Sequence, residues 1–516
     1  MNAAENLIAK AANLGIEVCF ANPGTTEMPF VVALAKVGKV RSVLCLFEGV
    51  CTGAADGYAR MKHHPALTLL HLGPGFGNGI ANLHNAHRAH SPVVNLIGDQ
   101  ATWHRVVDAP LTSDVEALAK AASTWVRTSR SASDLSNDLA DAVAASTDLP
   151  GQIATLIVPH DFQIQEVETL DTATQASIPV SELDTGRVRD AANFLQSNEK
   201  VAVILGGRAL GELGLRAAKR IADSTGCQLF CEPFPARIER GGDLPTVERL
   251  PYFPETILAA LKPYSRILLA GAAEPMSYFG YDGYPARLVT PQQQLIHLAN
   301  TTDDVTVALD TLADEVARAT TRDAPHPQTE PFIYPTGPLS SETICAAIAL
   351  LQPKDAVIVD EGATTSAPYF AMSRSAPHHS LLTLTGGAIG QGMPCATGAA
   401  IACPDRKIIS LQADGSGMYT LQSLWTQARE RLNVTTLIFA NRRYRILEIE
   451  LARAGHAVPS ALSSALCELV NPHLDWVHLA NGMGVKARRV ESTEDLLSAL
   501  KQSFANSGPE LIEIVF

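Results

Sequence analysis

The sequence predicts an α/β protein made of three doubly wound parallel-sheet domains. A chain of 516 residues is too long for a single hydrophobic core, and this length corresponds to about three domains. Short apolar segments rich in β-branched residues alternate with longer amphipathic segments, a pattern typical of parallel strands covered by helices. Two polar stretches, at 161–182 and 321–337, interrupt the alternation, and we interpret them as linkers.

The linkers separate three blocks, at 1–165, 185–320 and 338–516. Parallel strands need crossover helices, so each block is expected to form its own sheet with helices on both faces. In the first block we expect strands at 18–20, 43–46, 67–70, 93–97 and 154–158. In the other two we expect strands at 201–205, 357–359, 407–411, 434–439 and 511–516.

A glycine-rich segment at 206–211 follows the first strand of the second block. A turn of this kind could hold the phosphates of a dinucleotide at a helix N-terminus. Its spacing is not GxGxxG, however, and no acidic residue is convincingly placed ~20 residues later. We therefore favour a structural turn over a nucleotide site.

Composition excludes several classes of function. With 46% hydrophobic and 18% charged residues, the chain has an ordinary globular composition, and its net charge of −13 argues against nucleic-acid binding. We find no run of ~18 apolar residues that would predict a membrane span, and no basic N-terminal segment that would predict a signal peptide. Nine cysteines without a CxxC spacing indicate free thiols in a reducing cytoplasm.

Asp414 and Asn441 are the most informative polar pair in the chain. Each follows an apolar segment expected to be a strand, and a helical segment at 421–431 lies between them. A strand, helix and strand return the chain to the same edge of a parallel sheet, where open α/β sheets bind ligands. Carboxylate and amide oxygens suit Mg²⁺ that is itself bound to a phosphorylated ligand. This pair predicts a cofactor diphosphate site.

Glu48 is the candidate partner of that site in the first block. It ends an apolar segment at 44–47 and precedes an expected helix at 54–60. An isolated acid in this position is more often a first-turn residue that satisfies helix N–H groups. The surrounding segment, Glu48 to Arg60, reads EGVCTGAADGYAR, and this pattern favours a functional role for Glu48 over that of an ordinary first-turn residue.

Together, the two motifs resemble those of thiamine diphosphate (ThDP) enzymes of the acetolactate synthase and benzoylformate decarboxylase superfamily. The resemblance spans the whole chain and is nearest to acetolactate synthase large-subunit homologues. Two positions depart from the usual motif, because Ala413 stands for a glycine and Ala440 for an asparagine. The resemblance implies that the three blocks are the pyrimidine-binding, central and diphosphate-binding domains. It also implies a homodimer or homotetramer in which Glu48 of one copy faces Asp414 of another.

In this family the matching glutamate hydrogen-bonds the aminopyrimidine ring and helps to activate the cofactor, so Glu48 is the first catalytic candidate. The segment at 384–394 resembles the one that bends ThDP, with a bulky apolar side chain between the two rings. The resemblance implies the following further contacts to ThDP and Mg²⁺: the Gly387 carbonyl, Ile389, Thr364, Gly415 and Ser416 for the cofactor, and Asp414, Asn441 and the backbone carbonyl of Arg443 for the metal.

Two further segments resemble the substrate side of benzoylformate decarboxylase. Asn22-Pro23-Gly24-Thr25 places Thr25 at a substrate-binding hydroxyl, and His71 falls at the first catalytic histidine. Imidazole exchanges protons near neutral pH, which suits a proton shuttle. The second histidine has no match, because Phe279 occupies the corresponding position.

An unusual arginine cluster, Arg442-Arg443-Tyr444-Arg445, follows Asn441. It could form a solvated loop or ion pairs at a dimer interface. Alternatively, Arg442 or Arg445 could attract the carboxylate of a substrate. Ile446, which comes next, is bulkier than the residue benzoylformate decarboxylase has there, so the pocket is expected to be narrower.

The sequence therefore predicts an enzyme that uses ThDP and Mg²⁺ to make or break a C–C bond next to a carbonyl. The first reading is decarboxylation of a 2-oxo acid with carboligation to a second carbonyl compound such as an aldehyde, as in acetolactate synthase. The second is decarboxylation alone, as in benzoylformate decarboxylase. A catalytically degenerate ThDP-binding subunit is a weaker alternative. FAD is not expected as a cofactor.

Overall fold

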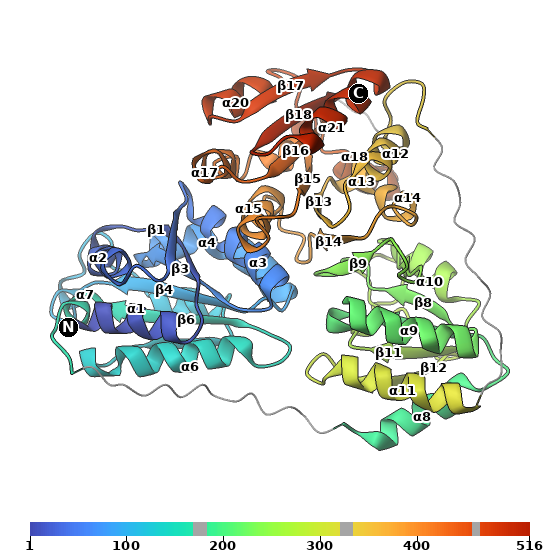
Figure 1. Cartoon of the computed structure of the whole chain (residues 1–516), viewed down its shortest axis with the longest axis horizontal. Helices are drawn as coiled ribbons and strands as arrows, with labels where there is room; N and C mark the ends of the chain where they lie inside the picture. Colours follow the sequence, from blue (N-terminus) through green and yellow to red (C-terminus); the bar gives the residue numbers. More distant parts are fainter. Residues whose placement is uncertain (169–182, 320–333, 457–464) are drawn as a thin grey trace.

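The computed structural model describes residues 1–168, 183–319, 334–456 and 465–516. Within these ranges the chain forms three sheets, each in a separate domain (Figure 1). The N-terminal domain, drawn in blue, and the central domain, in green and yellow, both lie below the C-terminal domain, in orange and red. This arrangement confirms the predicted fold class. Most of both predicted linkers lies outside the described residues, and the first linker begins with a short helix, α7 (His160–Gln163), instead of a loop.

The N-terminal sheet has the strand order β2-β1-β3-β4-β6-β5, with every neighbouring pair parallel. Alternate residues of a strand face opposite helix layers: Phe20 packs with α3 and α4, and Cys19 packs with α1, α2 and α6. The strands are β1 (Val18–Asn22), β2 (Arg41–Leu44), β3 (Ala66–His71), β4 (Val93–Asp99), β5 (Trp125–Thr128) and β6 (Ile153–Pro159). The helices are α1 (Ala3–Asn13), α2 (Met28–Val37), α3 (Glu48–Lys62), α4 (Leu72–Arg88), α5 (Val115–Lys120) and α6 (Leu135–Thr147).

The second strand of this domain lies two residues earlier than we expected. β2 is an edge strand whose last register partner on β1 is Ala21, opposite Leu44. The strand expected at 43–46 therefore begins at Arg41 and ends at Leu44, with the same length of four residues. Glu48 is consequently the first residue of α3 instead of a strand-end residue.

The central sheet has the order β10-β8-β7-β11-β12, again with parallel neighbours. Its strands are β7 (Val201–Leu205), β8 (Gln228–Cys231), β10 (Glu248–Arg249), β11 (Arg266–Ala270) and β12 (Gln294–Ala299). Its helices are α8 (Thr185–Leu195), α9 (Glu212–Thr225), α10 (Pro254–Leu261) and α11 (Val305–Ala319). The glycine-rich segment is a 3-10 turn, η4 (Gly207–Leu210), that leads into α9.

The C-terminal sheet has the order β17-β18-β16-β15-β13-β14-β9. Its own strands are β13 (Ala356–Glu361), β14 (His379–Thr383), β15 (Ile408–Ala413), β16 (Val434–Ala440), β17 (Lys486–Val490) and β18 (Glu510–Val515). Its helices are α12 (Ser341–Leu351), α13 (Ala363–Ser366), α14 (Tyr369–Met372), α15 (Gly392–Ala402), α16 (Asp414–Gly417), α17 (Ser423–Glu430), α18 (Arg445–Arg453), α20 (Trp476–Gly482) and α21 (Thr493–Ala505). In the described residues, no helix has the length and apolar character needed to cross a bilayer.

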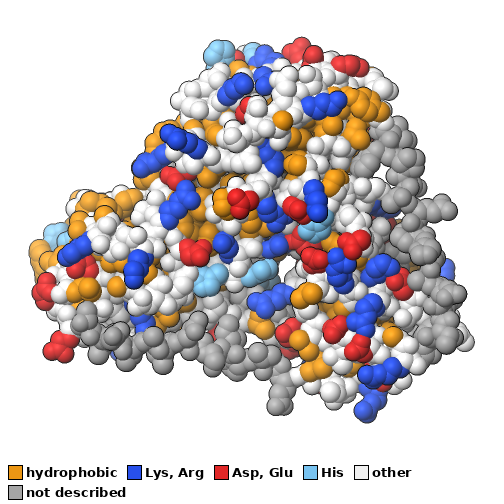
Figure 2. Space-filling view, viewed as in Figure 1, with side chains coloured by type: hydrophobic (Ala, Val, Ile, Leu, Met, Phe, Trp, Pro, Cys, Tyr) orange, Lys and Arg blue, Asp and Glu red, His pale blue; other side chains and the backbone are white. Residues whose placement is uncertain are grey.

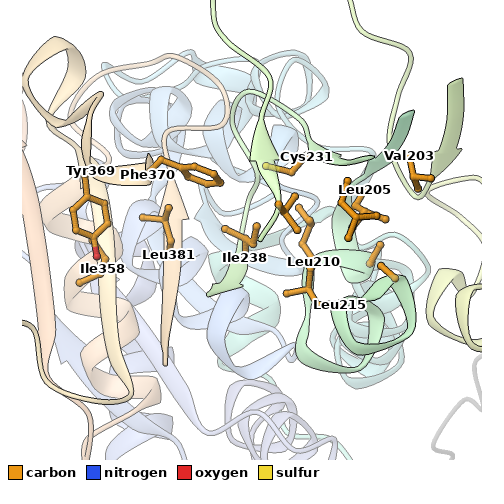
Figure 3. Close-up of a cluster of buried hydrophobic side chains, with 14 of the residues drawn as sticks. Val203, Leu205, Leu210, Leu215, Cys231, Ile238, Ile358, Tyr369, Phe370 and Leu381 are labelled. Atoms are coloured by element: carbon orange, nitrogen blue, oxygen red, sulfur yellow. The ribbon is translucent and has the colours of Figure 1, made fainter. Parts of the chain in front are cut away.

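One edge strand of the C-terminal sheet comes from the central block of the sequence. β9 (Ile238–Arg240) pairs antiparallel with β14, so the sheet is not purely parallel as predicted. Figure 3 shows the consequence for the core: Ile238 lies between Leu381 of the C-terminal domain and Cys231 of the central domain. The apolar core of the central domain therefore continues into the C-terminal domain.

Helices α3 and α15 join the N-terminal and C-terminal domains through very close packing. A Cβ added to Gly57 would approach the carbonyl oxygen of Cys395, and one added to Gly398 would approach that of Ala54, both closer than the 3.0 Å that Cβ atoms keep. Only glycine allows these two backbones to approach so closely. Buried Arg60 of α3 adds a polar tie by donating to the Thr383 carbonyl at 2.7 Å.

We expect Gly398→Ala to destabilise the protein, because the new methyl group must displace backbone atoms of α3. Overpacking of this kind costs about 1 to 3 kcal/mol of unfolding free energy, which would lower the midpoint of thermal unfolding. Gly482→Ala is the matched control, since that helical glycine has nothing within 4 Å of an added Cβ. Equal midpoints for the two variants would contradict this account of the α3–α15 contact.

Candidate active site

Glu48 lies at the N-terminus of α3, where the first turns of α3 and α4 converge. Its side chain is 9% exposed, and Oε2 accepts a hydrogen bond from Asn78 Nδ2 at 3.0 Å. Gly75 brings the α4 backbone so close that an added Cβ would lie 3.1 Å from Glu48 Oε1 and 3.3 Å from His71 Cβ. Glu48 and His71 therefore flank the same glycine. The sequence reasoning assigned no role to Asn78.

His71 ends β3 and is held by a buried carboxylate that the sequence reasoning missed. Its Nδ1 lies 2.8 Å from Glu27 Oε2 and 3.2 Å from Thr26 Oγ1. Glu27 is fully buried and also accepts hydrogen bonds from Gly24 N and Thr26 Oγ1. Burial raises the pKa of Glu27, although these hydrogen bonds act in the opposite direction and lower it. With Nδ1 bound to Glu27, the imidazole keeps Nε2 for other contacts.

The hydroxyl beside His71 belongs to Thr26, the neighbour of the predicted residue Thr25. Thr25 is exposed in the 3-10 turn η1 (Thr25–Glu27), whereas Thr26 is buried against Glu27 and His71. Consecutive residues of a helical turn point in different directions, so Thr26 joins the network of His71 and Thr25 lies outside it. The signal that could have found the network is Glu27, three residues after Gly24, as in a capping box.

Asp414 and Asn441 lie at the carboxyl ends of neighbouring parallel strands, as their spacing predicted. β15 and β16 pair in register up to Ala413 opposite Phe439. Buried Asp414 accepts the N–H groups of Gly415 at 2.8 Å and Arg442 at 2.7 Å, which links the two strand ends. Burial is the main reason why the pKa of Asp414 is raised to about 6. A bound cation would offset the cost of this buried charge.

The backbone after Asn441 directs a carbonyl group toward the same edge. Residues 442–444 pair with 467–469 through hydrogen bonds from Leu469 N to Arg442 O and from Tyr444 N to Cys467 O. In this antiparallel pattern the intervening residue, Arg443, turns its own N–H and C=O to the opposite side. Its N–H accordingly donates to Asn441 Oδ1 at 3.1 Å. The Arg443 carbonyl is therefore directed toward the Asn441 side chain, where a metal ligand was predicted.

The segment at 384–394, predicted to bend the cofactor and called the cofactor loop below, is held by buried Glu361, to which the sequence assigned no role. Glu361 accepts hydrogen bonds from Gly390 N at 2.5 Å and from Gly392 N. Gly387 has φ of +75° and is exposed, and Ile389 is half-buried in the same loop. Asn82 of α4 connects this loop to α3 by donating to the carbonyls of both Gly390 and Gly49.

Three of the remaining predicted cofactor contacts lie near these strand ends. Thr364 is half-buried in α13, directly after β13. The Gly415 N–H already donates to Asp414, and the Ser416 hydroxyl donates to the Ala413 carbonyl and accepts from Gln412 Nε2. The Ser416 hydroxyl is therefore engaged with the protein instead of pointing freely outward.

Backbone strain marks the same strand ends. Three residues next to predicted site residues adopt left-handed conformations. Leu72 (φ 52°) follows His71, Ala363 (φ 50°) precedes Thr364, and Arg442 (φ 59°) follows Asn441. Each such residue costs of order 1 kcal/mol, and such residues concentrate at functional sites. The Arg442 position has the backbone conformation that favours glycine.

An aromatic cluster from the central domain borders the loop and α18. It comprises Phe234, Tyr252, Phe253, Tyr278, Phe279 and Tyr281, with ring centroids 4.9–6.4 Å apart. Tyr281 donates to Glu450 of α18 at 2.9 Å. Of the residues predicted to line the substrate pocket, Phe279 is 56% exposed, Ile446 is half-buried and Arg445 is exposed. Arg443, not Arg445, forms an ion pair, with Glu448 at 3.6 Å.

A cavity of about 1130 Å³ lies elsewhere, between the N-terminal and central domains. Figure 2 shows basic and histidine side chains gathered where these domains face each other. The glycine turn lines this cavity, and the Gly207 N–H donates to the carboxylate of Glu232. Because Glu232 is an internal acceptor for this N–H group, the geometry agrees with the structural turn favoured from the sequence.

Comparison with known proteins decides the family. Residues 1–118 match the description "Thiamine pyrophosphate enzyme, N-terminal TPP binding domain", and residues 360–514 match "Thiamine pyrophosphate enzyme, C-terminal TPP binding domain". The chain belongs to the thiamine pyrophosphate enzymes. Glu48 and His71 lie in the first matched domain, and Asp414 and Asn441 in the second. Among the described residues, no hydrogen bond or ion pair joins the two groups.

Full-length relatives in this family have two kinds of name. The chain is 46% identical over 519 residues to the "Putative acetolactate synthase large subunit IlvX" of Mycobacterium tuberculosis, covering 100% of this chain and 99% of the relative. It is 28% identical over 530 residues to a benzoylformate decarboxylase of Pseudomonas aeruginosa, covering 97% and 96%. A solved 4-hydroxybenzoylformate decarboxylase of Rhodococcus jostii superposes with a TM-score of 0.87 at 25% identity, covering 99% and 98%.

We expect Glu361 to make the stability of the cofactor-free protein depend on pH. Burial raises the pKa of Glu361 from 4.5 to about 7, so folding favours its protonated form. This contribution is fully present below 4.5 and is lost as pH rises through about 7. It amounts to about 1 to 3 kcal/mol, so the thermal midpoint should fall between pH 5 and pH 8.

The measurement compares Glu361→Gln with the parent protein across this pH range. The variant should lose less stability as pH rises, because it has no carboxyl group to ionise at this position. Glu494→Gln, at an exposed position of α21, is the control and should follow the parent. Parallel curves for all three proteins would show that Glu361 does not contribute to the pH dependence.

Proposed function

We propose that this protein uses ThDP and Mg²⁺ to decarboxylate a 2-oxo acid and to join the remaining fragment to a second carbonyl compound. The bound cofactor would supply the carbon nucleophile and hold the electron pair left when CO₂ departs. Asp414, Asn441 and the Arg443 carbonyl would hold Mg²⁺, and their oxygen donors fit a hard cation. Glu48, with Asn78, would hold the pyrimidine ring.

The lack of a direct contact between the two groups of one chain supports a site shared between two copies, in which each group is one half-site. Glu48 of one copy would then face Asp414, Gly387 and Ile389 of the other, in a homodimer or homotetramer. The exposed Gly387 backbone allows the close approach of a flat ring. Nine free cysteines suit a cytoplasmic enzyme.

His71 would move protons at the substrate, and Glu27 would orient it. The Glu27 carboxylate keeps the His71 ring in one orientation and favours a proton on Nδ1, which leaves Nε2 for the substrate. Arg442 or Arg445 would attract the substrate carboxylate, and Ile446 and Phe279 would limit the size of the pocket.

The observation that favours carboligation is the part of the aromatic cluster at 278–281, which we call the aromatic wall. This wall has Phe279 where benzoylformate decarboxylase has a second histidine, so no imidazole delivers a proton from that side. Slow protonation leaves time for a second carbonyl compound to react. Decarboxylation with release of aldehyde is the second candidate. It is favoured by the Glu27–His71 pair and by the relatives named as decarboxylases.

A panel of 2-oxo acids tests this proposal. With ThDP and Mg²⁺, the protein should release CO₂ from at least one of pyruvate, 2-oxobutyrate and benzoylformate, and should form a 2-hydroxy ketone or 2-hydroxy-3-oxo acid product. Glu48→Gln should still bind ThDP–Mg²⁺ in calorimetry but lose at least about 100-fold in CO₂ release. Asp414→Ala should lose binding itself. ThDP binding without turnover of any acid would instead support a degenerate ThDP-binding subunit.

The neighbouring threonines allow a matched test of the proton-transfer network. Thr26→Val removes the hydroxyl that contacts Glu27 and His71, and should lower kcat about tenfold, which corresponds to one hydrogen bond of about 1.4 kcal/mol. Thr25→Val changes an exposed hydroxyl of the same turn, and its kcat should stay within about threefold. The reverse result would restore the assignment of Thr25 from the sequence.

A further inference from the structure

In the aromatic cluster, the Tyr278 hydroxyl forms no hydrogen bond with any described residue. By contrast, Ser277 Oγ donates to the Pro285 carbonyl at 2.8 Å, and the Tyr281 hydroxyl donates to Glu450 at 2.9 Å. The Tyr252 hydroxyl interacts with that of Tyr281. Across the parts of the chain that the structure describes, none of the hydrogen bonds found involves the Tyr278 hydroxyl. Its proton is therefore not committed to another protein group.

Tyr278 is directed at the cofactor loop by the rings around it. Its ring packs against Phe234, Tyr252 and Phe279 at centroid distances of 5.6, 5.1 and 5.2 Å. Its hydroxyl oxygen is the nearest atom to a Cβ built on Gly387, closer than the 3.0 Å that Cβ atoms keep. The side chain remains 37% exposed, so water can reach it. The hydroxyl thus lies against the backbone group that we propose to contact the cofactor.

We propose that Tyr278 is a proton donor of the reaction and that its hydroxyl sets the ratio of aldehyde release to carboligation. The proposal rests on the proposed function and assigns to Tyr278 the proton transfer of the second histidine, for which the sequence offered no residue. Phe279, at the position of the missing histidine, has no proton to give. Tyr278, its neighbour, does have one and faces the loop.

The proton balance of the two outcomes is simple. In both, the bond between the carboxylate carbon and the carbonyl carbon of the 2-oxo acid breaks, and CO₂ leaves. For aldehyde release, the former carbonyl carbon takes the Tyr278 proton, and the tyrosinate regains a proton from water. For carboligation, the same carbon forms a bond to the carbonyl carbon of the second substrate, whose oxygen takes a proton. The Tyr278 proton on carbon therefore belongs to only one of the two outcomes.

The weak acidity of a phenol suits a proton donor that must compete between aldehyde release and carboligation. Burial raises the pKa of Tyr278 above its ordinary value of 10, although the nearby Arg88 opposes this change. Such a hydroxyl gives up its proton less readily than an imidazolium ion. Proton delivery is then slow enough for a second carbonyl compound to compete.

Tyr278→Phe tests the proposal by removing one oxygen atom and keeping the ring. Pyruvate, or benzoylformate with acetaldehyde as acceptor, is supplied to the ThDP–Mg²⁺ enzyme, and aldehyde and ligated product are measured together with CO₂. The ratio of aldehyde to ligated product should fall at least fivefold, with CO₂ release reduced less. Tyr281→Phe, which removes a committed hydroxyl from the same cluster, should keep the parent ratio.

A second measurement does not depend on turnover. The protein is labelled with 3-fluorotyrosine, and the ¹⁹F resonance that is missing in Tyr278→Phe is assigned to Tyr278. This resonance should shift when ThDP and Mg²⁺ are added without substrate, because the hydroxyl lies on the cofactor loop. The control resonance is that of Tyr264, in the central domain beside Phe230, which should not move.

The outcomes separate this inference from the proposed function. If the parent protein releases no CO₂ from any 2-oxo acid, the proposed function fails, whereas the fluorine shift still reports whether Tyr278 lies at the cofactor. If the parent turns over but Tyr278→Phe keeps its product ratio, Tyr278 is not the donor. A Tyr278 resonance that stays in place at saturating ThDP–Mg²⁺ also overturns the inference.

Discussion

The contact between α3 and α15 is the constraint on which the rest of the structure depends. Gly57 and Gly398 let the two helix backbones approach more closely than any side chain would permit. Their apolar residues form one core cluster that reaches both the N-terminal and the C-terminal sheets. Glu48 begins one of these helices, and the cofactor loop leads directly into the other. The packing thus sets the positions from which both half-sites extend.

The sequence predicted the fold class well because strands and crossover helices leave regular apolar patterns. The pairing of Asp414 with Asn441 also followed from sequence, since the two ends of one strand–helix–strand unit must meet at one sheet edge. The position of β2 could not be predicted in this way, because this edge strand begins with two exposed polar residues, Arg41 and Ser42, which carry no apolar pattern. The antiparallel strand β9 was also missed, since three residues carry too little pattern to show which sheet they join.

The site residues that the sequence did not predict are those that contact and hold the residues it did predict. Glu27 lies beside His71, Asn78 beside Glu48, and Glu361 beneath the cofactor loop. Each acts through a contact between segments far apart in the chain, and such contacts leave no spacing signal. Thr26 shows the complementary difficulty, because a motif match locates a turn but not the direction in which each of its residues points.

The β9–β14 pairing affects which parts of the molecule can move together. Backbone hydrogen bonds join a segment of the central domain to the sheet that carries Asp414, and the shared core in Figure 3 reinforces them. These two domains should therefore behave as one rigid body during any opening of the molecule. The aromatic wall would then keep its distance from the diphosphate half-site whenever the molecule moves.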